Sequence, residues 1–497
     1  MKLLKRHIAF ILIFALSVLP LTGCGNVDDN AVIYYEATIA AGTLDPQLAS
    51  NDTELLMIRN LFEGLMRVDK DGQVVPAVAS EYSFEDNTYI FKLSETSVWS
   101  DGEPVTAYDF EFAFRRAVDP KTRSPYAGKL RSILNAELIM LGQIEPEHLG
   151  VKAKDSTTLT ITLSGIDSNF LYKLTTAVCM PCREDFFNDC KGQYGLSKSH
   201  IITNGSYRLT KWNQEEFAAR LHRNNKYYGD FAAQNSAVFI SFHPETPNLE
   251  KLEKSSVDIA HITMAEADTA ASKGLKTAQH QNILWVMEMN ELYSYDLRRA
   301  LYLAFDRSNY AGDLGVGYNV AYSFFPDALI NEKLDYVGIE EYDINESRTL
   351  YNTALNQYSD GKLPSTKLYY YSSPDMVLPI NNIVGHWQKQ LGAYINTKPY
   401  DNMSDLKFAL DSNECAIAVY PITVTDKDPS VLAYQLGYDF SNTSVKALPE
   451  VQKSILSEKK LMPIAFENTV AAYSGDILDF NFSIGNGLID FAYVTKK

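Results

Sequence analysis

Strand-like and helix-like patterns alternate along the whole of this 497-residue chain, without an internal repeat. The stretch NAVIYYEATI at 30–39 suits a strand, while DTELLMIRNLFEGL at 52–65 places its apolar residues at helical spacing. A chain of this length can bury several hydrophobic cores, so we expect two or three domains. The strands and short helices follow no regular βαβ period. The pattern therefore predicts an α/β fold with short crossover helices.

Hydrophobic periodicity also predicts where the individual elements lie. The helix at 105–120 has the clearest limits, because Thr106 can cap it and Asp109 completes a near capping box. Asp52 is the expected cap of the helix at 52–65. The other expected strands are 87–93, 156–163, 203–212, 365–373 and 415–422, and the other expected helices are 294–311, 382–392 and 448–463.

The first 23 residues have the pattern of an export signal. Lys2, Lys5 and Arg6 precede the apolar run IAFILIFALSVLPL, which is too short for a typical spanning helix. The run ends in LTGCG, which resembles the lipobox of bacterial lipoproteins, so Cys24 is the expected lipidated residue. An ordinary signal peptide with an incidental cysteine is the alternative. Residues 24–30 would then be a short tether at the outer face of the cytoplasmic membrane.

The charge of the chain argues against a nucleic-acid ligand. Residues 1–23 hold three of the 45 Lys and Arg side chains and none of the 62 Asp and Glu, so the chain from Cys24 onward has a formal charge of −20. A surface of this sign repels phosphate backbones and anionic lipids. We therefore expect no nucleic-acid partner.

The cysteines do not predict a metal site. Cys179 and Cys182 have the C-x-x-C spacing, but a single such pair is a weak zinc signal. Cys190 and Cys415 are the other two cysteines after Cys24. So small a number in an exported chain favours one incidental disulfide or free buried thiols. We expect neither a metal nor a cofactor.

No catalytic motif can be identified. The loop TVTDKDPS at 423–430 offers Asp426 and Asp428 as a general acid and base, a metal site, a ligand anchor or a solvated turn. The chain lacks HExxH, P-loop and G-x-S-x-G patterns, and SEKK at 457–460 is interpreted as the solvated face of a helix. These residues favour binding over catalysis, and we expect that the protein is not an enzyme.

Several stretches resemble, in order, the solute-binding proteins of bacterial peptide ABC importers. They are LFEGLMRVDKDGQVVPAVASEY, VWSDGEPVTAYDFEFAFRRAVDPKTRSPYA, LGVKAKDSTTLTITL, ITNGSYRLTKWNQEE, DLRRALYLAFDR, YDINESRTLYNTA and WQKQLGAYI. The resemblance covers essentially the whole chain after the signal. It is to family 5 of the bacterial extracellular solute-binding proteins, the oligopeptide- and dipeptide-binding group.

The resemblance implies a two-lobed fold like that of the type II periplasmic binding proteins, with an additional inserted domain. The ligand would lie in a cleft between the lobes and be buried when they close. By chain order in the family, lobe I would comprise 31–60, 176–282 and 471–497. The inserted domain would be 61–175, and lobe II would be 283–470.

The resemblance also implies where the ligand binds. Peptide-binding members hold an extended peptide by main-chain hydrogen bonds, with roomy pockets for its side chains. Tyr126 and Trp387 could instead be core aromatics, and Asn204-Gly205 could instead form only a turn. The expected cleft residues are Ser50, Asn51, Tyr126, Asn204, Gly205, Glu288 and Trp387.

One expected anchor of the ligand is missing. In peptide-binding relatives, an aspartate four residues before a proline pairs with the free α-amino group of the peptide. Thr425 occupies that position here, and it carries no charge. Asp426 lies one residue further on and could replace the missing carboxylate. Either the anchor has moved, or the ligand lacks a free amino terminus.

The resulting hypothesis is a lipid-anchored, monomeric substrate-binding protein that delivers oligopeptides to the permease subunits of an ABC importer. A receptor for a non-peptide solute, such as a metal chelate, haem or a modified peptide, is one alternative. A peptide sensor without transport is the other.

Overall fold

The computed structural model describes residues 31–165, 167, 169–215, 217–326, 337–358, 360–424, 432–433, 436–438, 448–480, 482 and 487–497. Within these ranges, none of the helices combines the length and the apolar character that a membrane span requires.

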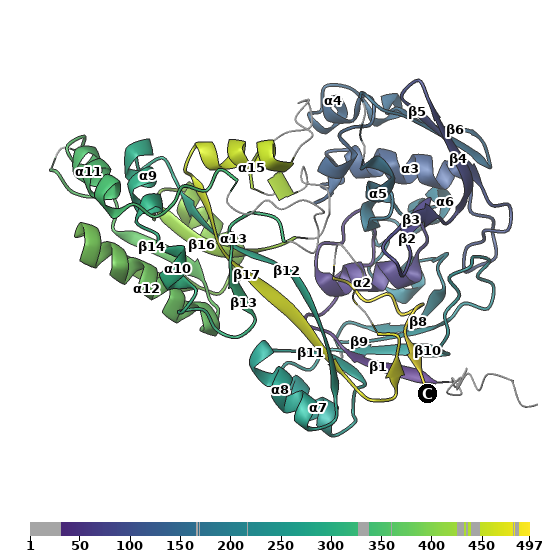
Figure 1. Ribbon diagram of the computed structural model, residues 1–497. Coiled ribbons are helices and arrows are strands. Elements are labelled where there is room, and N and C mark those ends of the chain that lie inside the picture. Colours follow the sequence, from purple (N-terminus) through teal and green to yellow (C-terminus); the bar gives the residue numbers. More distant parts are fainter. Residues whose placement is uncertain are drawn as a thin grey trace, which may run out of the picture.

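Two long antiparallel strands connect the two halves of the molecule. They are β12 (Lys276–Met289) and β17 (Leu461–Tyr473), which pair along nearly their whole length. Both belong to a sheet of eleven described strands, whose order is β15-β14-β16-β12-β17-β11-β1-β10-β9-β8, with β13 paired to β17. Figure 1 shows these strands running from one half to the other through the middle of the molecule.

The half that we call lobe I is built around the N-terminal strand of the described chain. β1 pairs in parallel with β10 and β11, and β11 pairs with the C-terminal end of β17. The elements are β1 (Val32–Glu36), β8 (Tyr207–Asn213), β9 (Ala218–Arg223), β10 (Ala237–Ser241), β11 (Ile259–Ile262), α2 (Asp52–Leu61), α6 (Glu184–Asp189), α7 (Asn248–Glu253), α8 (Met264–Ser272), β18 (Ile477–Leu478) and β19 (Thr495–Lys496).

The other half, lobe II, packs its helices around the opposite end of the same sheet. β16 pairs with the C-terminal half of β12, and β14 continues the sheet in parallel. The elements are α9 (Tyr295–Leu303), α10 (Arg307–Tyr310), β13 (Tyr318–Val320), α11 (Ile344–Leu355), β14 (Lys367–Tyr371), α12 (Pro374–Leu391), β15 (Asn396–Tyr400), α13 (Met403–Asp411), β16 (Ile417–Thr423) and α15 (Leu448–Ser457).

A smaller antiparallel sheet, with strand order β4-β5-β7-β6, lies on top of lobe I. Helix α3 packs against it and buries Phe110 and Phe114 completely. The elements are β2 (Met66–Val68), β3 (Val74–Pro76), β4 (Ala79–Glu85), β5 (Thr88–Leu93), α3 (Ala107–Val118), α4 (Ala136–Met140), β6 (Val151–Asp155), β7 (Thr158–Thr162) and α5 (Phe170–Lys173).

Two separate hydrophobic cores meet at the long strands. One core joins lobe I to the small sheet and includes Ile33, Phe110 and Ala471. The other fills lobe II from Leu284 to Phe466. The division falls beside a β-bulge, where Gln281 pairs with Asn468 and Ile283 pairs with Glu467, leaving Asn282 without a partner on β17. Because a bulge bends a strand and raises its local twist, this point is the natural hinge between the two cores.

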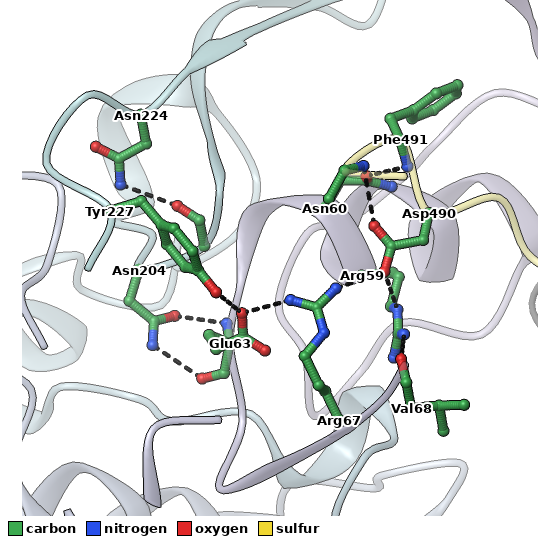
Figure 2. A network of polar contacts seen from close by, with 12 residues as sticks. Arg59, Asn60, Glu63, Arg67, Val68, Asn204, Asn224, Tyr227, Asp490 and Phe491 are labelled. Carbon is green, nitrogen blue, oxygen red and sulfur yellow. Dashed lines mark hydrogen bonds and ion pairs between the residues drawn. The ribbon is translucent and has the colours of Figure 1, made fainter. Parts of the chain in front are cut away.

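A buried network of charges ties lobe I to the small sheet and to the C-terminus (Figure 2). Arg67 of β2, which precedes the small sheet in the chain, bonds Glu63 at 2.7 Å and Asp490 at 2.6 Å. Arg59 of α2 reaches the same Asp490 oxygen at 3.1 Å, and Tyr227 donates to Glu63 at 2.5 Å. Because every carboxylate here meets a guanidinium, the buried charges compensate one another.

Several expected element limits are confirmed and others are wrong. Thr106 caps α3 as expected, and its N–H donates to the Asp109 carboxylate at 2.8 Å. Asn51, not Asp52, caps α2, since its side chain accepts from Glu54 N–H at 2.9 Å. The helix expected at 294–311 is divided into α9 and α10.

The prediction for 448–463 fails at its C-terminal end. Helix α15 stops at Ser457, and Pro463 lies inside β17, next to a second bulge between Trp285 and Val286 of β12. Proline has no main-chain N–H to donate to a neighbouring strand, and a β-bulge can accommodate such a residue. SEKK is therefore not the solvated face of a helix: Lys459 has φ of 54° and is 4% exposed.

Candidate ligand-binding site

A cavity of about 280 Å³ lies at the hinge, between the two lobes. Lobe I contributes β1, α2 and β11 to its wall, lobe II contributes β13 and α12, and both hinge strands form part of it. The residues that carry polar groups into the wall are Tyr35, Thr38, Asp52, His261, Thr263, Asn282, Tyr318, Asp375, Glu467, Asn468 and Thr469.

The bulge positions the floor of this cavity. Asn282 is 6% exposed, and its Oδ1 accepts a hydrogen bond from Thr469 Oγ1 at 2.7 Å. Its main-chain carbonyl accepts from Val424 N–H at 2.7 Å, which ties the end of β16 to the hinge. The other end of the Asn282 amide has no partner among the described residues, and Asn282 lines the cavity. A polar side chain is thereby held at the hinge with one hydrogen-bonding group unused.

The electrostatic character of the cavity is acidic. Asp52, Asp375 and Glu467 all line it, and no Lys or Arg does among the described residues. Burial raises the pKa of Glu467 above its usual value, although Trp285 Nε1 donates to its Oε2 at 2.7 Å. Burial against the cleft wall also raises the pKa of Asp52. Glu467 is half-buried, whereas Asp52 and Asp375 are exposed to solvent.

The histidine in the wall is not a cation at neutral pH. Burial lowers the pKa of His261 to about 4. Its ring packs edge-on against Tyr35 at 6.3 Å between centroids and tilted against Phe482 at 5.9 Å. His261 therefore contributes an aromatic, neutral surface and leaves the negative charge of the cavity uncompensated.

A smaller cavity of about 50 Å³ adjoins the first and shares Asp52 and Leu488 with it. It contains one of the expected ligand residues, Tyr126, whose hydroxyl donates to the carbonyl of Ser50 at 3.4 Å. The structure thus brings Ser50 and Tyr126 together beside the cleft. Their contact with a ligand stays a prediction.

Asn51, Asn204 and Gly205 lie in lobe I with their polar groups already in use. The Asn51 amide caps α2 and donates to Ala40 O at 3.2 Å. Asn204 is fully buried and bonds both main-chain groups of Glu63, at 2.8 and 2.9 Å. A Cβ added to Gly205 would come within 2.6 Å of the Leu61 main chain. These contacts give all three residues a structural role. None of the three lines either of the two cavities described above.

Glu288 and Trp387 lie in lobe II, away from both cavities. Glu288 accepts from Tyr420 Oη at 2.5 Å and pairs with Lys407 at 2.8 Å. Trp387 is 0% exposed, and its Nε1 donates to Leu301 O at 3.1 Å. The indole is enclosed by the lobe II core. This position agrees with the alternative expectation for Trp387, a core aromatic, and not with contact to a ligand. Cys24, Thr425, Asp426 and Asp428 lie outside the described residues.

The four described cysteines are buried and form no disulfide with one another. Among the described residues, no three His, Cys, Asp or Glu side chains lie close enough together to hold a metal ion.

Sequence reasoning did not identify Tyr35, Asp375 or Glu467 as site residues. Asp375 follows a Ser-Ser-Pro helix start at 372–374, a signal for a cap but not for a cleft. Glu467, Asn468 and Thr469 interrupt an otherwise apolar strand, and this local signal could have been noticed. Their proximity depends on the pairing of β1 with β11 and of β11 with β17, and on the position of α12 in lobe II, and no local pattern encodes it.

Comparison with known proteins gives consistent results. Residues 73–444 match a family model described as "Bacterial extracellular solute-binding proteins, family 5 Middle". The probable deoxycholate-binding periplasmic protein YgiS of Escherichia coli is 33% identical over 296 residues, which are 56% of this chain and 53% of that protein. The chain thus spans about half the length of this relative. The periplasmic oligopeptide-binding protein OppA of Salmonella typhimurium is 28% identical over 71% of this chain and 68% of its own length.

Solved structures show the same fold. Listeria monocytogenes OppA bound to peptide superposes with a TM-score of 0.77 at 20% identity, covering 95% of this chain and all of that one. The substrate-binding domain of an oligopeptide ABC transporter from Bacillus anthracis gives 0.78 at 20% identity, covering 95% of this chain and 99% of that one. These likenesses confirm the expected two-lobed α/β architecture. The limits expected for its parts, 31–60, 61–175, 176–282, 283–470 and 471–497, stay predictions.

Proposed function

Because the chain belongs to family 5 of the bacterial extracellular solute-binding proteins, we propose that it is the substrate-binding protein of an ABC importer and captures oligopeptides between its lobes. The observation that carries the proposal is the cavity at the hinge, whose wall is shared by both lobes. A ligand that bonds to both lobes at once binds the closed form better than the open form. Such a ligand shifts the equilibrium toward closure, and the closed form would be the one that the permease subunits recognise.

The geometry of the hinge suits this role. Among the described strands, only β12 and β17 run from one core into the other through a bulge, so a change in twist there can move one lobe as a unit relative to the other. Tyr35 from lobe I and Asn282 from the hinge present unused hydrogen-bonding groups to the cavity. These groups suit the main-chain N–H and C=O groups of an extended peptide.

Peptide capture is tested with the purified chain from residue 25 onward and random-sequence peptide pools of two to six residues. Native mass spectrometry would identify retained peptides, and calorimetry on the retained sequences would give their affinities. Binding of any length class supports the proposal. A complete absence of bound peptide, in protein first unfolded and refolded to remove any co-purified ligand, would contradict it.

Membrane attachment through Cys24 is part of the same proposal. Cells expressing the full chain would be labelled with an alkyne fatty acid, and the Cys24→Ala variant would serve as the control. Label on the wild-type chain, lost in the variant together with membrane association, supports lipidation. Wild-type protein that is processed but unlabelled would indicate an ordinary signal peptide.

Delivery to an importer predicts that deletion of the neighbouring permease genes abolishes uptake of the bound peptide, whereas a sensor would leave uptake unchanged.

A second candidate ligand is a non-peptide solute. The relative that is 33% identical is named for deoxycholate binding, and Thr425 lacks the charge that peptide-binding relatives place there. Calorimetry with deoxycholate, in parallel with the peptide pools, separates the two candidates. Binding of deoxycholate without any peptide would favour the second.

A further inference from the structure

One edge of the lobe I sheet has a charge opposite to that of the whole chain. Strands β1, β8, β9 and β10 hold four Lys and Arg side chains and one Asp or Glu, whereas the chain from Cys24 onward holds 42 and 62. The one acid, Glu36, is 1% exposed and pairs with Lys251 at 2.7 Å. These four strands therefore present positive charge to solvent and no exposed acid to offset it.

The strand register gathers charged and aromatic side chains on one face of these strands. Arg208 is opposite His222, Arg220 is opposite Phe239, and Phe239 is in turn opposite Tyr34. Residues opposed in a sheet lie on the same face, and successive residues alternate between faces. The residues that alternate with these five belong largely to the lobe I core. The five side chains, which we call the outer patch, therefore lie on the solvent side of the sheet.

The contacts within the outer patch leave its two arginines free for an external partner. The Arg220 guanidinium lies over the Phe239 ring, 4.7 Å from its centroid, and Tyr34 packs edge-on against the same ring at 5.4 Å. Arg208 and Arg220 are exposed, and neither forms an ion pair with any described residue. Burial lowers the pKa of His222, and the positive charges of both arginines lower it further. The patch thus concentrates unpaired positive charge beside an aromatic pair.

The outer patch lies at the start of the described chain. Its strand β1 begins at Val32, two residues before Tyr34. With the lipid on Cys24, as proposed above, residues 24–30 can span at most about 25 Å when fully extended. The start of β1 would then stay within that distance of the lipid headgroups. In Figure 1 the four strands lie below α2, on the side of lobe I opposite to the small sheet.

The chemistry of the outer patch suits a surface of anionic lipids. A guanidinium group can bond a phosphate through two parallel hydrogen bonds. Aromatic rings with a polar group are favoured at the level of the headgroups. The anionic surface attracts each nearby Lys or Arg, and the attraction decays within a Debye length. The acidic remainder of the chain is repelled by the same surface, so this face is the one that can approach it.

We propose that the outer patch rests on the anionic headgroups of the membrane that anchors the chain, with Arg208 and Arg220 bonding lipid phosphates and Tyr34 and Phe239 at headgroup level. The inference rests on the proposed lipidation of Cys24. It orients the molecule, with the lobe I sheet toward the bilayer and the small sheet away from it. Because the contact is electrostatic, salt releases it.

The test attaches the chain from Cys24 onward to vesicles chemically, through a maleimide lipid, so that it needs no lipidation in the cell. The four described cysteines are buried, which favours coupling at Cys24. The vesicles are either pure phosphatidylcholine or about one third phosphatidylglycerol, which gives a strongly anionic surface. Phenylglyoxal modifies accessible arginines, and mass spectrometry gives the reaction rate at each one.

A charge-matched control separates the outer patch from net charge. The test variant is Arg208→Gln/Arg220→Gln, and the control is Arg123→Gln/Arg348→Gln. Arg123 and Arg348 are exposed and form no ion pair with any described residue. They lie in the small-sheet region and on α11 of lobe II. All four arginines are on the surface, so the substitutions leave the cores intact, and thermal melting would verify this.

The expected result is protection of the outer patch by anionic lipid. Reaction at Arg208 and Arg220 should slow about tenfold on the anionic vesicles relative to the neutral ones, and reaction at Arg123 should not change. Salt at about 0.5 M should remove the protection. In flotation with the chain from residue 25 onward, the test variant should bind anionic vesicles about tenfold more weakly than the control variant.

The other outcomes overturn the inference. Equal rates at Arg208 and Arg220 on both kinds of vesicle, equal slowing at Arg123, or equal flotation of the two double variants would each do so. Protection that appears only when permease subunits are added would assign this face to a protein partner instead. Because the anchor is attached chemically, all these results leave lipidation and peptide capture standing. A lack of fatty-acid label on Cys24 in cells would contradict the anchor, and the inference with it, whatever the vesicles show.

Discussion

Asp109 shows how one side chain can serve two purposes at the start of a helix. Its carboxylate accepts from Thr106 N–H at 2.8 Å and from Trp99 Nε1 at 3.1 Å, and so links the first turn of α3 to a buried indole. Burial nevertheless raises its pKa to about 6, because desolvation outweighs these hydrogen bonds. The residue orders the helix start at the cost of holding a charge in a poorly solvated place.

This raised pKa predicts a pH dependence of stability. Between pH 4 and 6 the folded state holds a proton on Asp109 that the unfolded chain has released, so stability falls as pH rises through this window. The contribution is at most about 3 kcal/mol for a shift of about two pKa units. Urea denaturation of wild type and Asp109→Asn at several pH values measures it. The difference between the two proteins should change across pH 4–6, and a constant difference would contradict the assignment.

At the scale of one element, helix α2 depends on a loop that folds back onto its first turn. Glu54 accepts from Gly42 N–H at 2.9 Å and from Ser50 N–H at 2.8 Å, while Asn51 caps the same turn. The capping box therefore fixes residues 42–51 as well as the helix. Because Asp52 begins α2 and lines both cavities, the box also determines where that carboxylate lies.

Removing the cap should weaken the protein in a graded way. Asn51→Ala deletes the acceptor of Glu54 N–H and is expected to lower the free energy of unfolding by about 1 kcal/mol. Asn51→Ser keeps a capping oxygen and should lose clearly less. Chemical denaturation of the three proteins measures the difference. An equal loss in both variants would mean that the contact with Ala40, not the cap, carries the effect.

At the scale of the whole molecule, the charged network of Figure 2 joins three chain segments that are distant in sequence. Asp490 near the C-terminus forms ion pairs with Arg59 of α2 and Arg67 of β2. The two guanidinium groups are nearly inaccessible, with side chains 8% and 5% exposed. Lobe I and the small-sheet region are thereby held together by the last residues of the chain.

Breaking this junction should be costly. Asp490→Asn leaves the buried Arg59 without a carboxylate partner and Arg67 with Glu63 alone, so we expect a loss of about 3 kcal/mol in the free energy of unfolding. Asp476→Asn is the control, since Asp476 is exposed and forms no described ion pair. Denaturation midpoints measure both. A loss of under about 0.5 kcal/mol in Asp490→Asn, the usual range for a surface substitution, would contradict a structural role for the network.

The hinge cavity offers a second test at this scale. Gly487 has φ of 67° and lines the cavity, and a Cβ there would lie 2.8 Å from Asn282 Nδ2. Gly487→Ala should therefore displace the Asn282 side chain and weaken ligand binding by about tenfold, in addition to a backbone penalty of about 1 kcal/mol. Gly274→Ala carries a similar φ of 81° with no atom within 4 Å of the added Cβ. It should lose stability alone, and equal affinities in the two variants, measured by calorimetry, would exclude a role for this contact.

The sequence alone determined the features that depend on short stretches. The α/β alternation and the Thr106–Asp109 start of α3 both follow from local periodicity and capping. Membership of the family followed from motifs spread along the chain in a constant order.

Only the tertiary structure decided what surrounds the ligand. Tyr35, Asn282, Asp375 and Glu467 are distant in sequence. The pairing of β12 with β17, the pairing of β1 with β11 and the position of α12 in lobe II bring them to one cavity. Trp387 and Asn204 have side chains that suit a binding site, yet their neighbours enclose them in the interior. Whether a polar side chain faces a cavity or a core depends on strand register and packing between distant segments, and these are properties of the folded molecule as a whole.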